Sequence, residues 1–342
     1  MSTGRSVEVV GGGLAGLSLG LALRRRGVPV TVWEAGHYPR HRVCGEFITG
    51  LDRATAEALG IGAVLASARR HRTLAWFHQG RAAGVSTLPE AALGVSRHLL
   101  DQQLARAFCA AGGILHTGAR RELKETAPGR VVAAGRHRAA SDWVGLKLHV
   151  SNLPLAADLE LHLGAGAYVG LCGVEGDDVN VCGLFRRSEA LQAGAPATVL
   201  VRHLRAAGLQ HLAGRIEDAE TDGTSISSVA GIHFQTPGWA PGRLAIGDAF
   251  ALIPPFTGHG MAMAFQGAVT VVEPLVAWSG GRLEWDEATR RAHRGLKSRF
   301  RRRLLLARQV HRFLVEPRLQ PWLAGLSRTG LLPFRLFYRL LH

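Results

Sequence analysis

Cysteine is scarce in this chain, and its scarcity narrows the classes of protein to consider. The 342 residues include only four cysteines, and no two of them form a CxxC pair. Such a small number cannot build the disulfide framework of a small secreted domain, and the spacing does not indicate a structural zinc site. The histidines also lack ligand spacing such as HExxH. We therefore expect a reduced, cytoplasmic protein with no metal site.

Long hydrophobic runs are absent as well. The first apolar segment, residues 7–10, leads directly into three glycines, so it lacks the extended apolar region of a secretion signal. No stretch of 18 or more uncharged apolar residues follows, which is the length that indicates a membrane-spanning helix. The sequence thus predicts a chain that is neither exported nor membrane-spanning.

Acidic residues are few, and the resulting positive charge is concentrated at one end. The chain has 41 Lys and Arg residues against 26 Asp and Glu residues, a formal net charge of +15. Residues 290–342 hold fourteen Lys and Arg residues and a single acidic residue, Glu316, so the rest of the chain is close to neutral. No nucleic-acid recognition motif accompanies this charge, and we expect no nucleic-acid partner.

The basic C-terminal segment has the pattern of amphipathic helices divided by prolines at positions 317, 321 and 333. The apolar residues among its arginines are Leu304, Leu305, Leu306, Val310, Phe313 and Leu314. One interpretation is a helical cap on the preceding domain, with an arginine-rich outer face. The other is a basic surface, which includes the Arg301-Arg302-Arg303 face, held peripherally against an anionic membrane, an arrangement suited to a lipophilic substrate.

Glycine, in contrast, is abundant: 43 residues in 342, nearly twice the usual share of about 7%. Six positions near the N-terminus show why. A short apolar strand, residues 7–10, leads into Gly11-Gly12-Gly13-Leu14-Ala15-Gly16, and a helical run follows at residues 17–23. A second strand at residues 28–33 ends at Glu34, 21 residues after Gly13. This G-x-G-x-x-G pattern at a strand-to-helix junction predicts a dinucleotide-binding unit.

Each residue of this unit has a physical task. Gly11 permits the tight turn, Gly13 lets the backbone approach a pyrophosphate, and Gly16 lets helix and strand pack closely. The helix N-terminus offers unpaired N–H groups to phosphates. We expect Glu34 to accept hydrogen bonds from the adenosine ribose.

A second segment, about 230 residues further on, decides between NAD and FAD. Residues 243–248 read as another buried strand that ends in Gly247-Asp248, and a helical run begins at Met261. A dinucleotide-dependent dehydrogenase needs no such second site, whereas an elongated flavin cofactor does. An aspartate at the strand end can hold ribityl hydroxyls, and the N–H groups at the helix start can face the negative edge of a reduced flavin.

Taken together with the stretch from Arg42 through Cys44 to Glu46, and with Arg97 at the start of a helix, these motifs resemble the para-hydroxybenzoate hydroxylase superfamily of FAD enzymes. They are most similar to its geranylgeranyl-reductase-like branch, over residues 6–280. The resemblance implies FAD as the cofactor. It implies that the FAD-binding residues are Gly11, Gly13, Leu14, Ala15, Gly16, Glu34, Ala35, Arg42, Arg97, Gly247, Asp248, Pro255, Gly258, His259, Gly260 and Met261.

The predicted fold class is α/β, with a Rossmann-like FAD-binding domain, an inserted mainly antiparallel β-sheet substrate domain and a C-terminal helical region. Residues 144–150 and 159–163 alternate apolar and polar side chains, which favours a sheet buried on one face. We assign residues 1–70, 96–140 and 226–280 to the FAD-binding domain, residues 71–95 and 141–225 to the sheet domain, and residues 281–342 to the helical region.

Two departures from the superfamily pattern are informative. Hydroxylases of the superfamily carry an Asp-Gly pair used for FAD and NADPH, whereas the matching place here reads Val131-Val132-Ala133-Ala134-Gly135-Arg136. This predicts slow direct reduction by NADPH and a separate flavin reductase or other electron donor. The tryptophans that reductases of the branch and flavin halogenases carry on a substrate-domain strand are absent from residues 167–174 and 179–184.

Three side chains are candidates for catalysis. Cys44 could modulate the flavin ring or protonate an intermediate, or it could be a small buried hydrophobe. His259, between two glycines, could be a general acid or a spacer whose backbone alone matters. Tyr168 could line the substrate cavity or fill core. Glu46, a weaker candidate, could orient its loop or cap the next helix.

The sequence thus predicts an FAD-dependent reductase or dehydrogenase that acts on an apolar or aromatic organic substrate bound between the sheet and the isoalloxazine ring. Two alternatives remain. One is a monooxygenase or halogenase that works through a flavin C4a-(hydro)peroxide. The other is a flavoprotein whose main role is to bind a membrane or a partner.

Overall fold

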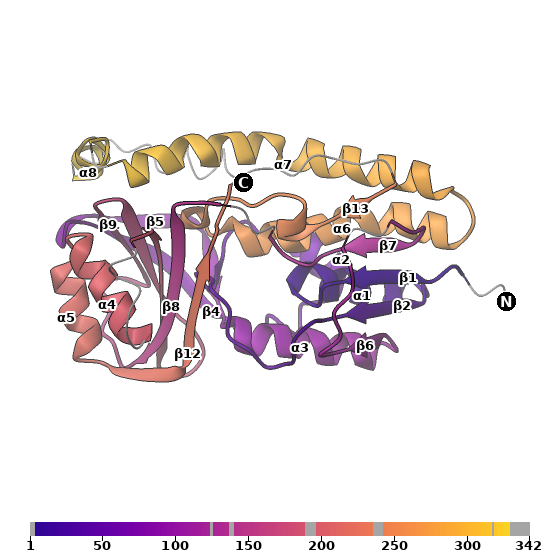
Figure 1. Ribbon diagram of the computed structural model, residues 1–342, viewed down its shortest axis with the longest axis horizontal. Coiled ribbons are helices and arrows are strands. Elements are labelled where there is room, and N and C mark those ends of the chain that lie inside the picture. The colour runs from indigo at the N-terminus through magenta and orange to yellow at the C-terminus, as the bar shows by residue number, and fades with distance from the viewer. Residues whose placement is uncertain are drawn as a thin grey trace.

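A computed structural model describes residues 4–123, 126–136, 140–188, 196–234, 242–316 and 318–328. Two sheets organise these residues (Figure 1). One has five strands in the order β13-β7-β1-β2-β6, and the other has eight in the order β12-β8-β11-β10-β9-β4-β5-β3. The first lies toward the N-terminus in Figure 1, and the second makes up the opposite lobe. This arrangement confirms the predicted fold class.

The five-stranded sheet is parallel throughout. Its strands are β1 (Val7–Val10), β2 (Val30–Trp33), β6 (Ile114–His116), β7 (Arg130–Val132) and β13 (Leu244–Ala245). The helices packed around it are α1 (Leu14–Arg25), α2 (Arg53–Leu59), α3 (Arg97–Ala110) and α6 (His259–Ser279). Their apolar side chains form one continuous core with the strands, as a doubly covered parallel sheet requires.

The eight-stranded sheet is antiparallel except where β4 runs parallel to β9. Its strands are β3 (Phe47–Ile48), β4 (Arg69–His78), β5 (Arg81–Gly94), β8 (Trp143–Ser151), β9 (Leu159–Gly164), β10 (Ala167–Gly173), β11 (Asp178–Arg186) and β12 (Glu220–Ala230). Alternate residues of β8, β10 and β11 pack under α4 (Pro196–Ala206) and α5 (Gln210–Glu217). The intervening residues, among them Tyr168 and Cys182, face a cavity instead.

The division of the chain between the lobes differs in detail from the predicted ranges. β3 pairs with β5 in the eight-stranded sheet although its residues fall within 1–70. The predicted boundary after residue 225 falls inside β12, which continues to Ala230. β3 is only two residues long, and β12 is a polar edge strand without clear apolar alternation, so both carry weak periodic signals.

α6 is long and apolar enough, by length and composition alone, to cross a membrane. Such a helix is weak evidence of a membrane span. Here 61% of its most apolar 18-residue window is buried, against neighbours that include α1 and α7 (Trp285–Val315). Packing in the core of the parallel-sheet domain therefore accounts for its composition.

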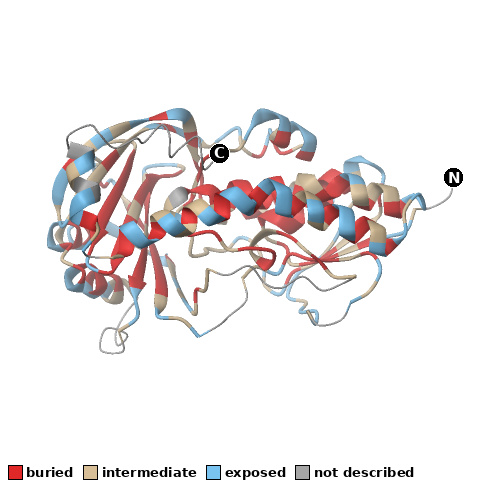
Figure 2. Ribbon diagram, turned by 90° about the horizontal axis from the view of Figure 1, so that it is seen from above, coloured by how far each residue is buried: buried red, intermediate tan, exposed pale blue. Residues whose placement is uncertain are grey.

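The C-terminal segment forms the long α7 and the short α8 (Gln320–Arg328). α7 lies along both lobes in Figure 1, and in Figure 2 buried and exposed positions alternate along it. It packs on α6 and reaches β9 and β10, as the cap interpretation predicts. The expected outward Arg301-Arg302-Arg303 face is wrong in one respect. Arg303 is buried and donates to Gln266 Oε1 at 2.6 Å, because it occupies the inner face of α7.

Candidate functional site

The glycine-rich turn leaves open space at one position only. A Cβ on Gly11, whose φ is +115°, would lie 2.3 Å from the Ala133 carbonyl oxygen, and one on Gly16 would lie 1.9 Å from the Gly11 oxygen. A Cβ on Gly13 would meet nothing nearer than a guanidinium nitrogen of Arg97 at 4.0 Å. Gly13 is also the N-cap of α1 and supplies no side-chain cap. The start of this helix is therefore open to an anionic ligand.

The carboxylate of Glu34 stabilises this turn. The N–H groups of Gly12 and Gly36 each donate to its carboxylate at 2.9 Å, and Arg40 pairs with it at 2.6 Å. Burial raises the pKa of this carboxyl. These hydrogen bonds and the nearby arginines lower the pKa by more than burial raises it, so the pKa lies below the usual value. Its contact with a ribose remains a prediction. Ala35, which follows it, is exposed.

Two arginines meet beside the open turn. Arg97 Nε lies 2.7 Å from one carboxylate oxygen of Asp101, and Arg42 Nε lies 3.1 Å from the other. The carboxylate of Asp101 is fully buried. Two guanidinium groups on one carboxylate leave a net positive charge, which suits a diphosphate. Sequence analysis identified both arginines but missed Asp101, for which the only signal was the i,i+4 spacing from Arg97.

Asp248 lies where β13 ends, in a 3-10 turn, η2 (Gly247–Ala249). Its carboxylate lines the cavity and forms no hydrogen bond or ion pair with any described residue. Burial raises the pKa of Asp248, and nearby guanidinium groups, first that of Arg97, oppose the rise. A carboxylate held in this way offers acceptors to a ligand's hydroxyl groups. A Cβ on Gly247, whose φ is +60°, would crowd Ala15 of α1.

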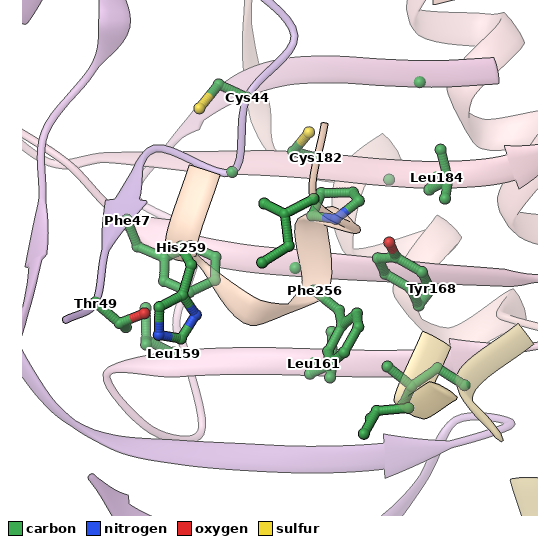
Figure 3. A pocket seen from close by; sticks show the side chains of 18 of the residues that line it. Cys44, Phe47, Thr49, Leu159, Leu161, Tyr168, Cys182, Leu184, Phe256 and His259 are labelled. Atoms are coloured by element: carbon green, nitrogen blue, oxygen red, sulfur yellow. The ribbon is translucent and has the colours of Figure 1, made fainter. Parts of the chain in front are cut away.

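The start of α6 faces the same cavity. Gly258 has a φ of +68°, and a Cβ there would lie 2.2 Å from the ring of Phe47. His259 follows as the first helical residue; it is 2% exposed and lines the cavity. Figure 3 shows Phe47, Thr49 and His259 grouped at one side of this cavity. Of the remaining predicted residues, Leu14, Ala15 and Met261 are buried in first helical turns, Gly260 is partly buried, and Pro255 lines the cavity.

The cavity itself has a volume of about 560 Å³ and is strongly apolar. Its walls come from the loop at residues 43–49, from the cavity-facing side of the eight-stranded sheet, and from η3 (Pro255–Thr257). Residues from the C-terminal half of α7 and from α8 complete the lining. Apolar residues that line it include Trp76, Leu159, Leu161, Leu184, Phe256 and Leu314. Its volume falls in the range of small-molecule sites.

The three candidate catalytic side chains all line this cavity. Cys44 is partly buried, and burial raises the pKa of its thiol above the usual value, so it holds its proton at neutral pH. Tyr168 is 3% exposed, and its hydroxyl makes no well-formed hydrogen bond with a described residue. Cys44 and His259 lie toward one side and Tyr168 toward the other (Figure 3). Their catalytic roles remain predictions.

Glu46, which sequence analysis named as able to orient its loop or cap the next helix, lies in a buried ionic cluster whose other members were missed. Glu46, whose φ is +56°, accepts from the backbone N–H of Arg97 at 2.9 Å, and its other oxygen lies 2.6 Å from His149 Nε2. Lys147 Nζ lies 3.5 Å from Glu46 and 2.9 Å from His41 Nδ1. Glu46 thus both caps α3 and anchors its loop to β8. The only sequence signal was a Lys and a His on an otherwise apolar strand.

This cluster contains a set of potential metal ligands. His41, Glu46 and His149 each offer a ligand atom, and these atoms lie within 4.8 Å of one another. The ammonium of Lys147 already contacts two of the three, and it supplies a positive charge where an ion would lie. The arrangement is therefore that of an internal ion pair network.

Arg136 was also missed. It follows β7, and it lines the cavity close enough to Asp248 to lower the pKa of that carboxyl. A basic side chain thus lies beside Asp248, two residues after Ala134.

Comparison with known proteins supports the architecture. A family model described as an NAD(P)-binding Rossmann-like domain matches residues 9–44. No curated protein sequence matches the chain.

Several solved structures share the fold. Klebsiella pneumoniae HpxO, complexed with FAD and uric acid, is 17% identical with a TM-score of 0.77, and the match covers 99% of this chain and 96% of that one. The flavin-dependent brominase Bmp2 is 15% identical with a TM-score of 0.75, and the match covers 98% of this chain and 92% of that one. A geranylgeranyl bacteriochlorophyll reductase-like protein from Thermoplasma acidophilum is 17% identical with a TM-score of 0.71, and the match covers 94% of this chain and 91% of that one. The chain therefore has the two-lobed fold of these proteins.

Proposed function

We propose that this protein is an FAD-dependent oxidoreductase that acts on an apolar or aromatic organic substrate. The observation that carries the proposal is the carboxylate of Asp248, which lacks a protein partner among the described residues. It lies near Arg97, which stands beside the open turn at Gly13, and it also lines the apolar cavity. These features suit an extended cofactor with a diphosphate, a polyol and a ring. A nicotinamide dinucleotide bound at the Rossmann turn would leave Asp248 unused.

The residues of the chain fit distinct parts of FAD. The turn at Gly13 and the guanidinium groups of Arg42 and Arg97 would hold the diphosphate, and Asp248 would hold the ribityl hydroxyls. When bound, the isoalloxazine ring supplies the two-electron chemistry. The apolar walls exclude water and leave the substrate few polar contacts, so Tyr168 is positioned to orient it.

Reduction or dehydrogenation is the reaction class that we favour. The absence of the Asp-Gly pair, with Arg136 in its region, argues against a standard hydroxylase, and the absence of the sheet tryptophans argues against a standard halogenase. A monooxygenase or halogenase remains the second candidate, because the brominase Bmp2 shares the fold.

The test begins with the purified protein, which should be yellow and should release FAD on denaturation. Release of FMN or NAD alone would refute the cofactor assignment. The bound flavin is then reduced by light without oxygen, and oxygen is admitted while absorbance is followed. One-step reoxidation favours a reductase or dehydrogenase. A transient spectrum between the reduced and oxidised forms favours the second candidate.

A further inference from the structure

The mouth of the cavity carries exposed apolar side chains. Among the described residues, six large hydrophobic side chains are substantially exposed, and four of them lie on α7 and α8. These four are Leu305 (54% exposed), Phe313 (46%), Trp322 (74%) and Leu326 (42%). Phe313, Trp322 and Leu326 also line the cavity. The opening of an apolar cavity is thus surrounded by apolar groups that face solvent.

Exposed arginines lie on the same C-terminal segment. Arg301, Arg302, Arg312 and Arg318 are all exposed, and Glu316 is the only acidic residue between positions 290 and 328. At about 100° per residue, Arg301, Leu305 and Arg312 fall within about 40° of one another around α7. Apolar and basic groups therefore share one face. We call the four apolar and four basic residues together the C-terminal rim.

We propose that the C-terminal rim docks on an anionic lipid bilayer and admits an apolar substrate from it into the cavity. Exposed tryptophan and phenylalanine side chains are stable at the boundary between lipid headgroups and acyl chains. Arginines beside them meet lipid phosphates. A bilayer supplies both the negative charge and the apolar phase that this rim matches. The entry route rests on the proposed function, because it requires the cavity to hold the substrate; the docking does not.

Electrostatic docking is tested by co-sedimentation of the flavin-loaded protein with vesicles of phosphatidylcholine, with and without phosphatidylglycerol. We expect binding to the anionic vesicles alone, and loss of binding at about 0.5 M salt, where charges are screened. Arg312→Gln together with Arg318→Gln should lower the partition coefficient about 30-fold.

The matched control is Arg290→Gln together with Arg291→Gln, which removes the same charge from the exposed N-terminal part of α7. These positions lie at least about 15 Å along the helix from Arg301, the nearest residue of the C-terminal rim, beyond a Debye length of about 8 Å, so binding should change little. An equal loss in the control would overturn docking at the cavity mouth. So would binding to neutral vesicles, or no binding at low salt.

Apolar contact is tested separately with lipids brominated on their acyl chains, which quench tryptophan fluorescence. Quenching should be larger in the wild-type protein than in Trp322→Phe, and Trp322→Ala should weaken binding at least threefold. Trp322 is exposed, so these variants should keep the wild-type circular dichroism. Equal quenching in wild type and Trp322→Phe would overturn the proposal.

FAD content is measured in the same samples. Protein without FAD that still binds anionic vesicles would refute the proposed function and leave docking supported. Flavin-loaded protein that does not bind anionic vesicles would refute docking and leave the proposed function supported.

Discussion

At the scale of single residues, glycines that look equivalent in the sequence have different tasks. Gly11 and Gly16 are required by close protein contacts, whereas a side chain on Gly13 would project into open space. The φ of Gly13 is −86°, which any residue adopts. The fold itself therefore tolerates a side chain at Gly13, and a bound diphosphate would not.

We predict that Gly13→Val folds with a thermal stability near that of the wild-type apoprotein and binds FAD at least about tenfold more weakly. Isothermal titration of the apoprotein measures the affinity. Gly16→Val is the contrasting variant and should fail to fold, because its Cβ would overlap a backbone oxygen. Undiminished FAD affinity in Gly13→Val would contradict the diphosphate assignment.

Asp248 provides a second residue-scale prediction. Loss of a charged hydrogen-bond partner costs about 1.5 to 3 kcal/mol, so Asp248→Ala should bind FAD roughly 10- to 150-fold more weakly while remaining folded. Asp248→Asn, which keeps one acceptor, should fall between Ala and wild type. The flavin-to-protein absorbance ratio after gel filtration reports the loss. A fully flavinated Asp248→Ala would show that the carboxylate does not hold the cofactor.

His311 lies among aromatic rings beside Tyr168, and neither of its ring nitrogens has a described partner. Burial lowers the pKa of His311 to about 4, against 6.5 in the unfolded chain. As pH falls, the unfolded state therefore binds a proton at a higher pH than the folded state does. The free energy of unfolding decreases for this reason between pH 6.5 and pH 4. In chemical denaturation, His311→Phe should remove up to about 3 kcal/mol of this pH dependence. An unchanged slope would mean that other groups account for it.

At the scale of elements, α7 joins the two lobes with one buried and one exposed face. Phe300, on the buried face of α7, is 2% exposed, whereas Leu305, five residues later, is 54% exposed. The helix period separates these two positions and lets one segment serve as both cap and outer surface.

We predict that Phe300→Ala lowers the free energy of unfolding by about 3 to 5 kcal/mol and that Leu305→Ala lowers it by less than about 0.5 kcal/mol. Urea denaturation measures both. Equal effects of the two substitutions would contradict the packing of α7 on α6.

At the scale of the whole molecule, the structure joins the lobe that contains the Rossmann turn to an apolar cavity. Residues 133–136 lack the Asp-Gly pair, and Arg136 lines the cavity instead. We therefore expect the electrons to come from a separate flavin reductase or another donor.

We predict that micromolar NADPH alone reduces the bound flavin slowly, while dithionite reduces it completely as a control for an intact site. Stopped-flow absorbance under nitrogen makes the comparison. Rapid reduction by NADPH without substrate would show that the missing pair is not needed.

By itself the sequence determined the Rossmann turn, the short strand that precedes Asp248, and the inserted sheet. These features depend on local backbone requirements and on periodic patterns, which neighbouring residues alone establish. Gly11 and Gly16 must turn and pack tightly whatever surrounds them. The alternation in 144–150 and 159–163 indicated strands, but the expected burial of one face alone was wrong, because both faces of β8 and β9 are buried.

Only the tertiary structure decided how distant segments combine. The network of Glu46, Lys147 and His149 joins positions about 100 residues apart, and the packing of the Glu46 loop against β8 brings them together. The same holds for Arg303, whose charge suggested exposure but which the packing of α7 buries. It holds as well for the cavity mouth, because no local pattern shows that Phe313 and Trp322 line a cavity formed by a sheet that begins near residue 47. Such contacts are set by the packing of whole elements, so they appear only when the elements are assembled.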